Sequence, residues 1–462
     1  MARYSRRKRF NYGGCILILT VILAILGLFA VGVKFRDSSP ELRLPNETTT
    51  APPTTGNTEK NPSVSITEPT TQPTTTTPPA VTLVSTAKIT ATGDILMHGP
   101  CIEGGKVSNG YDFTPYFHYL QDYIKNADYA VANLETTLAG PTREYKGYPN
   151  FNCPDDIVTA LQDSGFDMLL TANNHCYDTG TNGYHRTQEV LTDAGMDYIG
   201  SIPNTETPGY LIKDINGISI GMVCYTYETD SSPNVVAPNG ITMKDADEKL
   251  INSFNVNELS AFYERIDGQI QEMKDQGAEA LVLYIHWGEE YQLNENKTQN
   301  TIAQKMCDLG IDVIVGGHPH VIQPMELLTS TEDENHKTIC LYSTGNALSN
   351  QRQGLISSIK TKHTEDGILF NFTFAKYSDG TVRLEDASVI PTWVNKYKSS
   401  STGKDVYEIY PLDIQIEDWK TQMDLRDSTE KEARDSYDRT MKIVNEGLEE
   451  INDYLQSLPP IA

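Results

Sequence analysis

A short stretch that joins a predicted buried strand to two histidines constrains the fold most. Residues 311–315 are mainly apolar and predict a buried strand. Gly316 and Gly317 allow a tight exit from it, and His318 and His320 follow on either side of one proline. Proline fixes its own φ and restricts the residue before it, so both imidazoles are held on a stiff turn. Neutral imidazole is a common metal ligand, so the stretch predicts either a metal site or two loop histidines without one.

Predicted strands that are followed by polar residues recur along the chain. Predicted strands alternate with amphipathic helices from residue 87 onward, and residues 354–416 add further strand-like patterns. This order predicts one α/β domain over residues 87–416, in which sheets pack between helices. Polar residues stand at the carboxyl ends of five predicted strands, where open α/β folds place their sites. These residues are Asp94, Glu135, Asn174 with His175, His286, and His318 with His320.

Carboxylates, an amide oxygen and imidazoles form a mixed set of oxygen and nitrogen ligands. Such a set suits one or two divalent ions such as Mn²⁺, Fe²⁺ or Zn²⁺ better than Ca²⁺ or thiolate-bound Zn²⁺. Two ions about 3.5–4 Å apart can share a bridging carboxylate. Taken alone, each residue also has a structural interpretation: Asp94 can form a turn, Asn174 can bond to its own loop, and His286 can pack in a core. Five such clusters in one chain favour a shared site.

The first 86 residues predict an anchored protein. Residues 1–12 carry five basic side chains and no acid, and residues 13–33 are an uncharged apolar run long enough to span a bilayer. We expect an uncleaved single-pass anchor in the cell membrane, with a cytoplasmic N-terminus and an extracytoplasmic main domain. A cleaved signal peptide is the alternative. Residues 34–86 are rich in Thr and Pro and predict an extended linker.

Charge and cysteine content limit the partners and the environment. The net charge is −25, and because the first 33 residues contribute +5, the remaining residues carry −30. This acidity argues against nucleic acid as a partner and suits a soluble domain outside the cytoplasm. The seven cysteines form no CxxC pair, so the sequence predicts neither a zinc knuckle nor a dense disulfide framework, and it leaves the pairing open.

Residues 417–462 are rich in charge and predict a C-terminal helix with one apolar stripe. The residues of the stripe recur at spacings of three and four: Tyr437, Met441, Val444, Leu448, Ile451, Leu455 and Leu458. Two interpretations are open. The stripe either packs back on the domain or contacts another chain.

Six motifs follow one another across residues 88–350. They are Gly93-Asp94, Asn133-Leu134-Glu135, Asn173-Asn174-His175 with Asp178, His286-Trp287-Gly288 with Glu290-Tyr291, Gly317-His318-Pro319-His320-Val321 and Tyr342-Ser343-Thr344-Gly345-Asn346. In this order they resemble the CapA family of poly-γ-glutamate capsule proteins, which in turn resembles calcineurin-like metallophosphoesterases. The resemblance implies a four-layer α/β sandwich of the metallophosphoesterase type with a dinuclear metal site.

The resemblance also implies how one ligand set holds the ions. The implied ligands are Asp94, Glu135, Asn174, His286, His318 and His320. Asp94 looks like the first-strand ligand, Glu135 stands where a bridging acid would be, and His318 and His320 would divide between the two ions. The chain departs from the phosphoesterase pattern twice. Three residues separate Asp94 from His98 where Asp-x-His is usual, and Glu135 has a longer side chain than the usual aspartate, so it either bridges differently or binds one ion.

Four further residues have roles implied by the resemblance. His175 resembles the histidine that protonates the leaving oxygen, and Asp178 would orient it. Glu290 and Asn346 would lie beside the substrate or behind the ligands. Cys176 follows His175, but no basic group is evident that would lower its pKa, so we interpret this thiol as structural.

These implications predict a protein that acts in synthesis, export or attachment of an anionic surface polymer, with poly-γ-glutamate as the polymer that the family implies. The expected partners are the membrane, membrane-bound polymer synthase subunits, and the polymer or a phosphoester substrate. Two alternatives stay open. One is a metal-dependent hydrolase of phosphoesters, or of another ester or amide, in the cell envelope. The other is a non-catalytic protein that tethers a polymer synthase.

Overall fold

The computed structural model describes residues 80–229, 232 and 235–459. The predicted basic tail, the apolar run 13–33 and nearly all of the linker therefore lie outside the described residues. Strand β1 (Leu83–Ile95) begins four residues before the predicted start of the domain at Ala87. No helix within these described ranges is long and apolar enough to cross a membrane.

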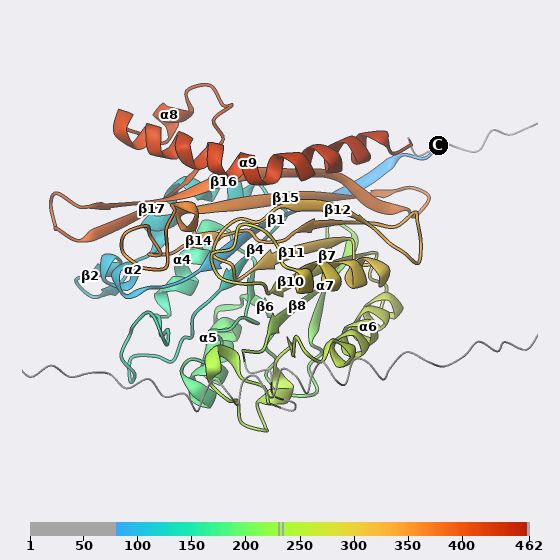
Figure 1. Ribbon diagram of the computed structural model, residues 1–462, viewed down its shortest axis with the longest axis horizontal. Coiled ribbons are helices and arrows are strands. Elements are labelled where there is room, and N and C mark those ends of the chain that lie inside the picture. Colours follow the sequence, from blue (N-terminus) through green and yellow to red (C-terminus); the bar gives the residue numbers. More distant parts are fainter. Residues whose placement is uncertain (1–79, 230–231, 233–234, 460–462) are drawn as a thin grey trace, which may run out of the picture. The chain divides into compact units, whose positions relative to one another are not determined.

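Two large β-sheets form the centre of the fold (Figure 1). The strands of the first sheet are β1, β4 (Tyr129–Leu134), β5 (Met168–Leu170), β6 (Asp197–Ile199), β14 (Asn346–Leu348), β15 (Asp366–Tyr377), β16 (Val382–Lys398) and β17 (Asp405–Pro411). Their order is β17-β16-β15-β1-β4-β5-β6, and β14 pairs with the end of β1. The strands of the second sheet are β7 (Tyr210–Ile215), β8 (Ile218–Tyr227), β9 (Ser253–Phe254), β10 (Ala280–His286), β11 (Val313–Gly317), β12 (Met325–Thr329) and β13 (Lys337–Leu341). Their order is β12-β13-β11-β10-β8-β7, and β9 pairs with β8.

Helices connect these strands, and most of them begin or end near a strand end. The α-helices are α2 (Gly99–Gly104), α3 (Gln121–Lys125), α4 (Asp156–Ser164), α5 (Gly180–Ala194), α6 (Leu259–Asp275), α7 (Lys297–Asp308), α8 (Trp419–Gln422) and α9 (Asp427–Ser457). The 3₁₀ helices are η1 (Thr114–Leu120), η2 (Pro238–Gly240), η3 (Glu248–Leu250) and η4 (His363–Glu365). A small hairpin pairs β2 (Lys106–Val107) with β3 (Gly110–Tyr111).

The two faces of each sheet enter different cores, because successive side chains of a strand point to opposite sides. In β10, Val282 and Tyr284 belong to the core between the sheets, whereas Leu283 belongs to the outer core that α6 and α7 cover. In β4, Val131 faces the inner core, and Ala132 faces the outer core that α4 covers. The layers therefore run helix, sheet, sheet, helix. The predicted α/β domain with sheets packed between helices is confirmed.

The apolar stripe of the C-terminal helix packs against its own domain. Val444, Ile451 and Leu455 of α9 join the core between the two sheets. The side chain of Arg439 on the same helix forms an ion pair with Asp366, at the start of β15, with atoms 2.6 Å apart. The interpretation in which this helix packs back on the domain is therefore confirmed.

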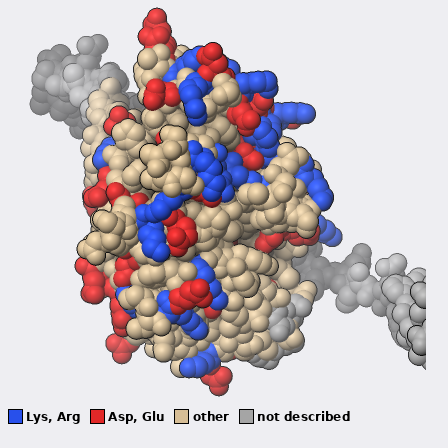
Figure 2. Space-filling view, turned by 90° about the vertical axis from the view of Figure 1, so that its left-hand side faces the viewer, with Lys and Arg blue, Asp and Glu red and all other residues tan. Residues whose placement is uncertain are grey.

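Basic and acidic side chains are interspersed on the side where β17 and α2 lie in Figure 1, and Figure 2 shows that side. Ion pairs contribute to this mixture. Lys396 and Lys398 of β16 lie 3.3 and 2.9 Å from the carboxylate of Asp405 on β17. The exclusion of nucleic acid as a partner stays a prediction.

The cysteines of the domain are unpaired. All six cysteines among the described residues are free and buried. Burial raises the pKa of Cys101 and of Cys224 to about 12, and it raises the pKa of Cys176 as well. Because the thiolate is the reactive form, we expect the unit Thr77–Ala462 to react with less than about one equivalent of an aromatic disulfide before denaturation. All six thiols should react after denaturation, and rapid native labelling of Cys176 would contradict its structural role.

Candidate metal centre

The carboxyl ends of parallel strands from both sheets converge on one place. β1, β4 and β5 run parallel in the first sheet, and β10 and β11 run parallel in the second. The six predicted ligands stand at or just after these ends, and all are buried: Asp94, Glu135, Asn174, His286, His318 and His320. The strand pairing places Asp94 opposite Asn133 on β4 and opposite Asn346 on β14.

Five of the six side chains form two groups of three that share one carboxylate. The groups are Glu135 with His286 and His318, and Asp94 with Glu135 and His320. In each group the candidate ligand atoms lie within 4.8 Å of one another. Asn174 lies beside the first group, because its Oδ1 is 2.9 Å from Nε2 of His286. The structure brings the predicted ligands together, and their role as ligands stays a prediction.

Polar atoms at the centre of the cluster lack partners, which a metal ion would supply. Both carboxylate oxygens of Glu135 and Nδ1 of His318 are buried without a hydrogen bond. The Nε2 atoms of His286 and His320 lie 3.5 and 3.8 Å from Oε1 of Glu135, beyond ordinary hydrogen-bond distance. Buried polar atoms of folded proteins nearly always have a partner. The donor set and its unpartnered atoms therefore fit one or two divalent cations.

The charges within the cluster act on one another. Burial lowers the pKa of His318 well below its usual value, and the neighbouring His286 and His320 lower it further. Burial also disfavours a charge on His320, but Glu135 and Asp94 outweigh it and raise the pKa of His320 to about 9. Burial disfavours the charge of Asp94 too, yet a 3.0 Å hydrogen bond from His320 prevails, and the pKa of Asp94 is lowered. Protons and metal ions therefore compete for His320.

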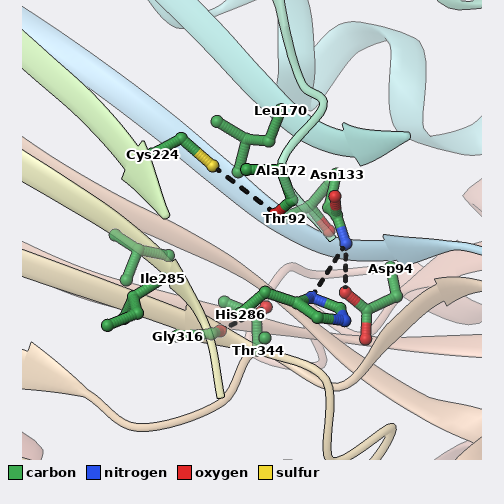
Figure 3. Close-up of a pocket in the computed structure, with 12 residues that line it drawn as sticks. Thr92, Asp94, Asn133, Leu170, Ala172, Cys224, Ile285, His286, Gly316 and Thr344 are labelled. Atoms are coloured by element: carbon green, nitrogen blue, oxygen red, sulfur yellow. Dashed lines mark hydrogen bonds between the residues drawn. The ribbon is translucent and has the colours of Figure 1, made fainter. Parts of the chain in front are cut away.

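An amide side chain that had no predicted role connects the two sheets. Nδ2 of Asn133 donates to Oδ1 of Asp94 at 2.8 Å and lies 3.4 Å from Nδ1 of His286 (Figure 3). Asn173 holds Asn133 in turn, since its Nδ2 donates to Oδ1 of Asn133 at 3.0 Å. The cavity that Asp94, Asn133 and His286 line measures about 20 Å³, room for about one water molecule.

The turn that carries the two histidines is strained as well as restricted by proline. His318 and His320 have φ values of 96° and 56°, in the left-handed region that side chains with a Cβ seldom adopt. Such residues cost about 1–3 kcal/mol each and persist where the surroundings determine them. The backbone N–H of His318 points to Oδ2 of Asp94 at 3.3 Å. The strained turn therefore sets the backbone N–H of His318 and the imidazole of His320 against the carboxylate of Asp94 on β1.

His175 and Asp178 form a buried pair beside the cluster. Nδ1 of His175 lies 2.8 Å from Oδ2 of Asp178. Asp178 is held in turn by the backbone N–H of Phe151 at 2.6 Å and by Nδ2 of Asn239 at 2.7 Å. With Nδ1 bound to the carboxylate, Nε2 is the nitrogen of His175 that can exchange a proton with a ligand. Asn239 lies in η2, far along the chain, and no sequence signal marked it.

The other singled-out residues lie around the cluster. His98 belongs to neither group of three: it packs edge-on against Phe151 with ring centres 5.2 Å apart, and burial lowers its pKa to about 4. Asn346 donates through Nδ2 to the carbonyl oxygen of His320 at 3.2 Å, so it supports the turn from behind. Glu290 is exposed beside the turn.

Comparisons with known proteins agree with the family resemblance of the motifs. Residues 88–351 match the family model described as "Bacterial capsule synthesis protein PGA_cap". The "Capsule biosynthesis protein CapA" of Bacillus anthracis is 28% identical over 335 residues, which cover 71% of this chain and 67% of that protein. The "PGA biosynthesis protein CapA" of Bacillus subtilis (strain 168) is 25% identical over 362 residues, which cover 74% and 83%.

Two solved structures align with parts of this chain. The NAD nucleotidase (NadN) of Haemophilus influenzae is 12% identical with a TM-score of 0.40, and the match covers 81% of this chain and 68% of that one. The purple acid phosphatase PPD1 from yellow lupin (Lupinus luteus) seeds is 11% identical with a TM-score of 0.32, and the match covers 66% and 53%.

Proposed function

Because the chain belongs to the PGA_cap family of bacterial capsule synthesis proteins, we propose that it acts in capsule formation as a metal-dependent hydrolase. Its place would be the synthesis, export or attachment of an anionic polymer. We further propose that this polymer is poly-γ-glutamate. The name of the Bacillus subtilis relative, "PGA biosynthesis protein CapA", supports that choice.

One observation carries the hydrolase proposal. Two groups of candidate ligands share Glu135, whose two oxygens are buried and have no hydrogen-bond partner. Asp94 and His320 would complete one ion's set, and His286 and His318 would complete the other. When bound, such ions polarise a substrate oxygen and lower the pKa of a water molecule. Mn²⁺, Fe²⁺ and Zn²⁺ all suit these ligands.

The chain's own proton donor would be His175. Asp178 fixes the imidazole through Nδ1, so Nε2 is left to give a proton to a leaving group. The hydrogen bonds of Asp178 with Phe151 and Asn239 hold this pair in place without using the candidate ligands. Proton transfer and metal binding are therefore separable functions of different residues.

This separation gives a direct test. We expect His175→Asn to keep its bound ions and to lose about 10²–10⁴-fold in turnover, the usual worth of a positioned acid or base. Turnover is measured on a phosphomonoester, a carboxylic ester and poly-γ-glutamate, with bound metal measured by mass spectrometry. His118→Asn, which changes an exposed histidine on η1, serves as the control and should match the wild type. If the His175 variant lost its bound metal together with its turnover, the assignment of His175 as the proton donor would be contradicted.

The wild-type metal content tests the site itself. We expect about two ions per chain, as in other dinuclear hydrolase sites. One ion would mean that Glu135 serves a single position. A folded, metal-free chain after purification with added metal would overturn the hydrolase proposal and leave the tether of a polymer synthase as the function to pursue.

The anchor and the partners complete the proposal. Residues 13–33 would hold the chain in the cell membrane with the domain outside, and membrane-bound synthase subunits would be its partners. The apolar sequence of that run supports the anchor. The stripe of α9 is a poor tethering surface, because Val444, Ile451 and Leu455 are buried in the domain core and the other stripe residues pack half-buried against the domain.

A further inference from the structure

An open cavity of about 560 Å³ is formed partly by the loop that carries the proposed proton donor. Sites that bind ligands usually measure about 300–1,000 Å³. The walls come from the loop after β4, from the loop that leads into α5, and from the segment after η2. Two of the residues that line it, Tyr177 and Thr179, are the chain neighbours of Asp178, whose carboxylate is paired with His175. The cavity and the proton donor therefore share one short loop.

Two basic side chains line this cavity, and among the residues that the structure describes no Asp or Glu does. Arg143 and Lys244 come from different walls, and neither forms an ion pair within the described ranges. The side chain of Lys244 is exposed and has no hydrogen-bond partner there either. The residues after the first 33 carry a net charge of −30. Two positive charges without a partner therefore meet at one place in an acidic chain.

Nearby acidic side chains do not neutralise these two charges. Glu144 and Asp245 follow Arg143 and Lys244 in the chain, but both are exposed and neither lines the cavity. Asp247 is buried and also lies outside the lining. Three side chains engage its carboxylate, at 2.7, 2.8 and 3.0 Å: those of Tyr177, Thr181 and His185. These contacts tie the segment that carries Lys244 to the loop that leads into α5.

The remaining polar groups of the cavity suit an anion as well. A terminal nitrogen of Arg143 donates to the carbonyl oxygen of Thr179, which fixes this guanidinium at the wall and leaves its other N–H groups free to donate. Three neutral donors of the lining have no side-chain hydrogen bond within the described part of the chain: Thr142, Asn182 and Thr242. Carboxylates accept strong, charge-assisted hydrogen bonds from Arg and Lys. The lining therefore matches a ligand that carries carboxylates.

We propose that this cavity binds carboxylate groups of the anionic polymer, with Arg143 and Lys244 as their contacts. A chain with a carboxylate on each unit can contact both cations together, which a single small anion does less well. The inference rests on the anionic polymer of the proposed function, but it does not depend on hydrolysis. Because neither cation is a candidate metal ligand, binding of the polymer and binding of the metal can be changed separately.

Binding of a labelled oligomer tests the cavity without any turnover. A fluorescein-labelled decamer of γ-linked glutamate is titrated with the purified full-length chain at low salt, and fluorescence anisotropy measures the affinity. We expect Arg143→Gln and Lys244→Gln each to bind the decamer about threefold more weakly, and the double variant about tenfold, because exposed charge contacts are individually weak. Higher salt should reduce these differences.

A matched double variant shows whether position or total charge matters. Arg426→Gln with Lys249→Gln removes the same two residue types at exposed positions outside the cavity, and it should bind within about twofold of the wild type. Equal affinities of the two double variants, or no binding by the wild type, would overturn the proposal. A glycerol phosphate oligomer of equal charge is titrated in the same way, and tighter binding of that oligomer would overturn the carboxylate polymer as the occupant.

Folding and metal content are measured for every variant. Lys244→Gln should fold like the wild type by circular dichroism, because its side chain contacts no other group in the described ranges. If Arg143→Gln does not fold, Lys244→Glu takes its place and should bind the decamer about tenfold more weakly. A metal-free chain with this order of affinities contradicts the hydrolase function and supports the inference. A metal-loaded chain without that order contradicts the inference alone.

Discussion

Glu135→Ala is expected to lose both metal ions, whereas Asp94→Ala and His318→Ala should each lose one. Both groups of candidate ligands contain Glu135, but each of the other two residues belongs to a single group. Loss of a residue behind the ligands costs about 10–100-fold in metal affinity or activity, so loss of the shared ligand should cost more. Bound metal per chain, measured by mass spectrometry after gel filtration, distinguishes the three variants.

A matched control makes this pattern specific. Glu326 lies on β12, where it accepts a hydrogen bond from the hydroxyl of Tyr342 at 2.7 Å and touches neither group. Glu326→Ala should therefore retain the metal content of the wild type. Retention of one full ion by Glu135→Ala would show that this glutamate serves a single position, and retention of two would remove it from the ligand set.

Arg439→Ala is expected to lower the free energy of unfolding by about 3–5 kcal/mol, because it leaves a buried carboxylate without its partner. Asp366 is 1% exposed and receives Nε and a terminal nitrogen of Arg439 at 2.9 and 2.6 Å. Ser436 adds a third contact at 2.6 Å. Urea unfolding of the unit Thr77–Ala462, followed by circular dichroism, measures the loss.

Two further variants distinguish the loss of the Arg439–Asp366 ion pair from a general effect of removing a charge. Lys442 is exposed on the same helix, so Lys442→Ala should change stability by less than about 0.5 kcal/mol. The double variant Arg439→Met with Asp366→Leu removes both charges and should recover part of the loss, because no unpaired carboxylate remains. If Arg439→Ala is as stable as the wild type, the ion pair does not fasten α9 to β15.

The candidate ligands could be predicted because they follow strands, and strands are the clearest pattern in this chain. A run such as residues 311–315 marks its own carboxyl end, and parallel strands bring those ends together. Strand ends did not predict the roles of Asn133, Asn173 and Asn239. Amide side chains are common in loops, and their hydrogen bonds to Asp94 and Asp178 depend on which strands and loops become neighbours.

Local geometry was also harder to predict than element type. Residues 114–125 show the pattern of one helix, but the structure has η1 followed by α3. Proline at position 319 predicted a stiff turn, yet the left-handed φ of His318 and His320 follows from contacts with β1 that no local pattern contains. The strand order was unpredictable for the same reason, since β14 and β15 join β1 from about 250 to 290 residues further along the chain.

The central position of β1 has a consequence during translation. Its partner β15 is made hundreds of residues later, as the hydrogen bond between Thr90 and Asn371 across 281 positions shows. At about 5–20 residues per second, the ribosome needs tens of seconds to cover that distance. Gly345, whose carbonyl oxygen accepts from the backbone N–H of Asp94, is also made long after Asp94. The cluster therefore cannot reach its final form until the chain has been made through β15, and the ion it takes depends on the metal supply where folding ends.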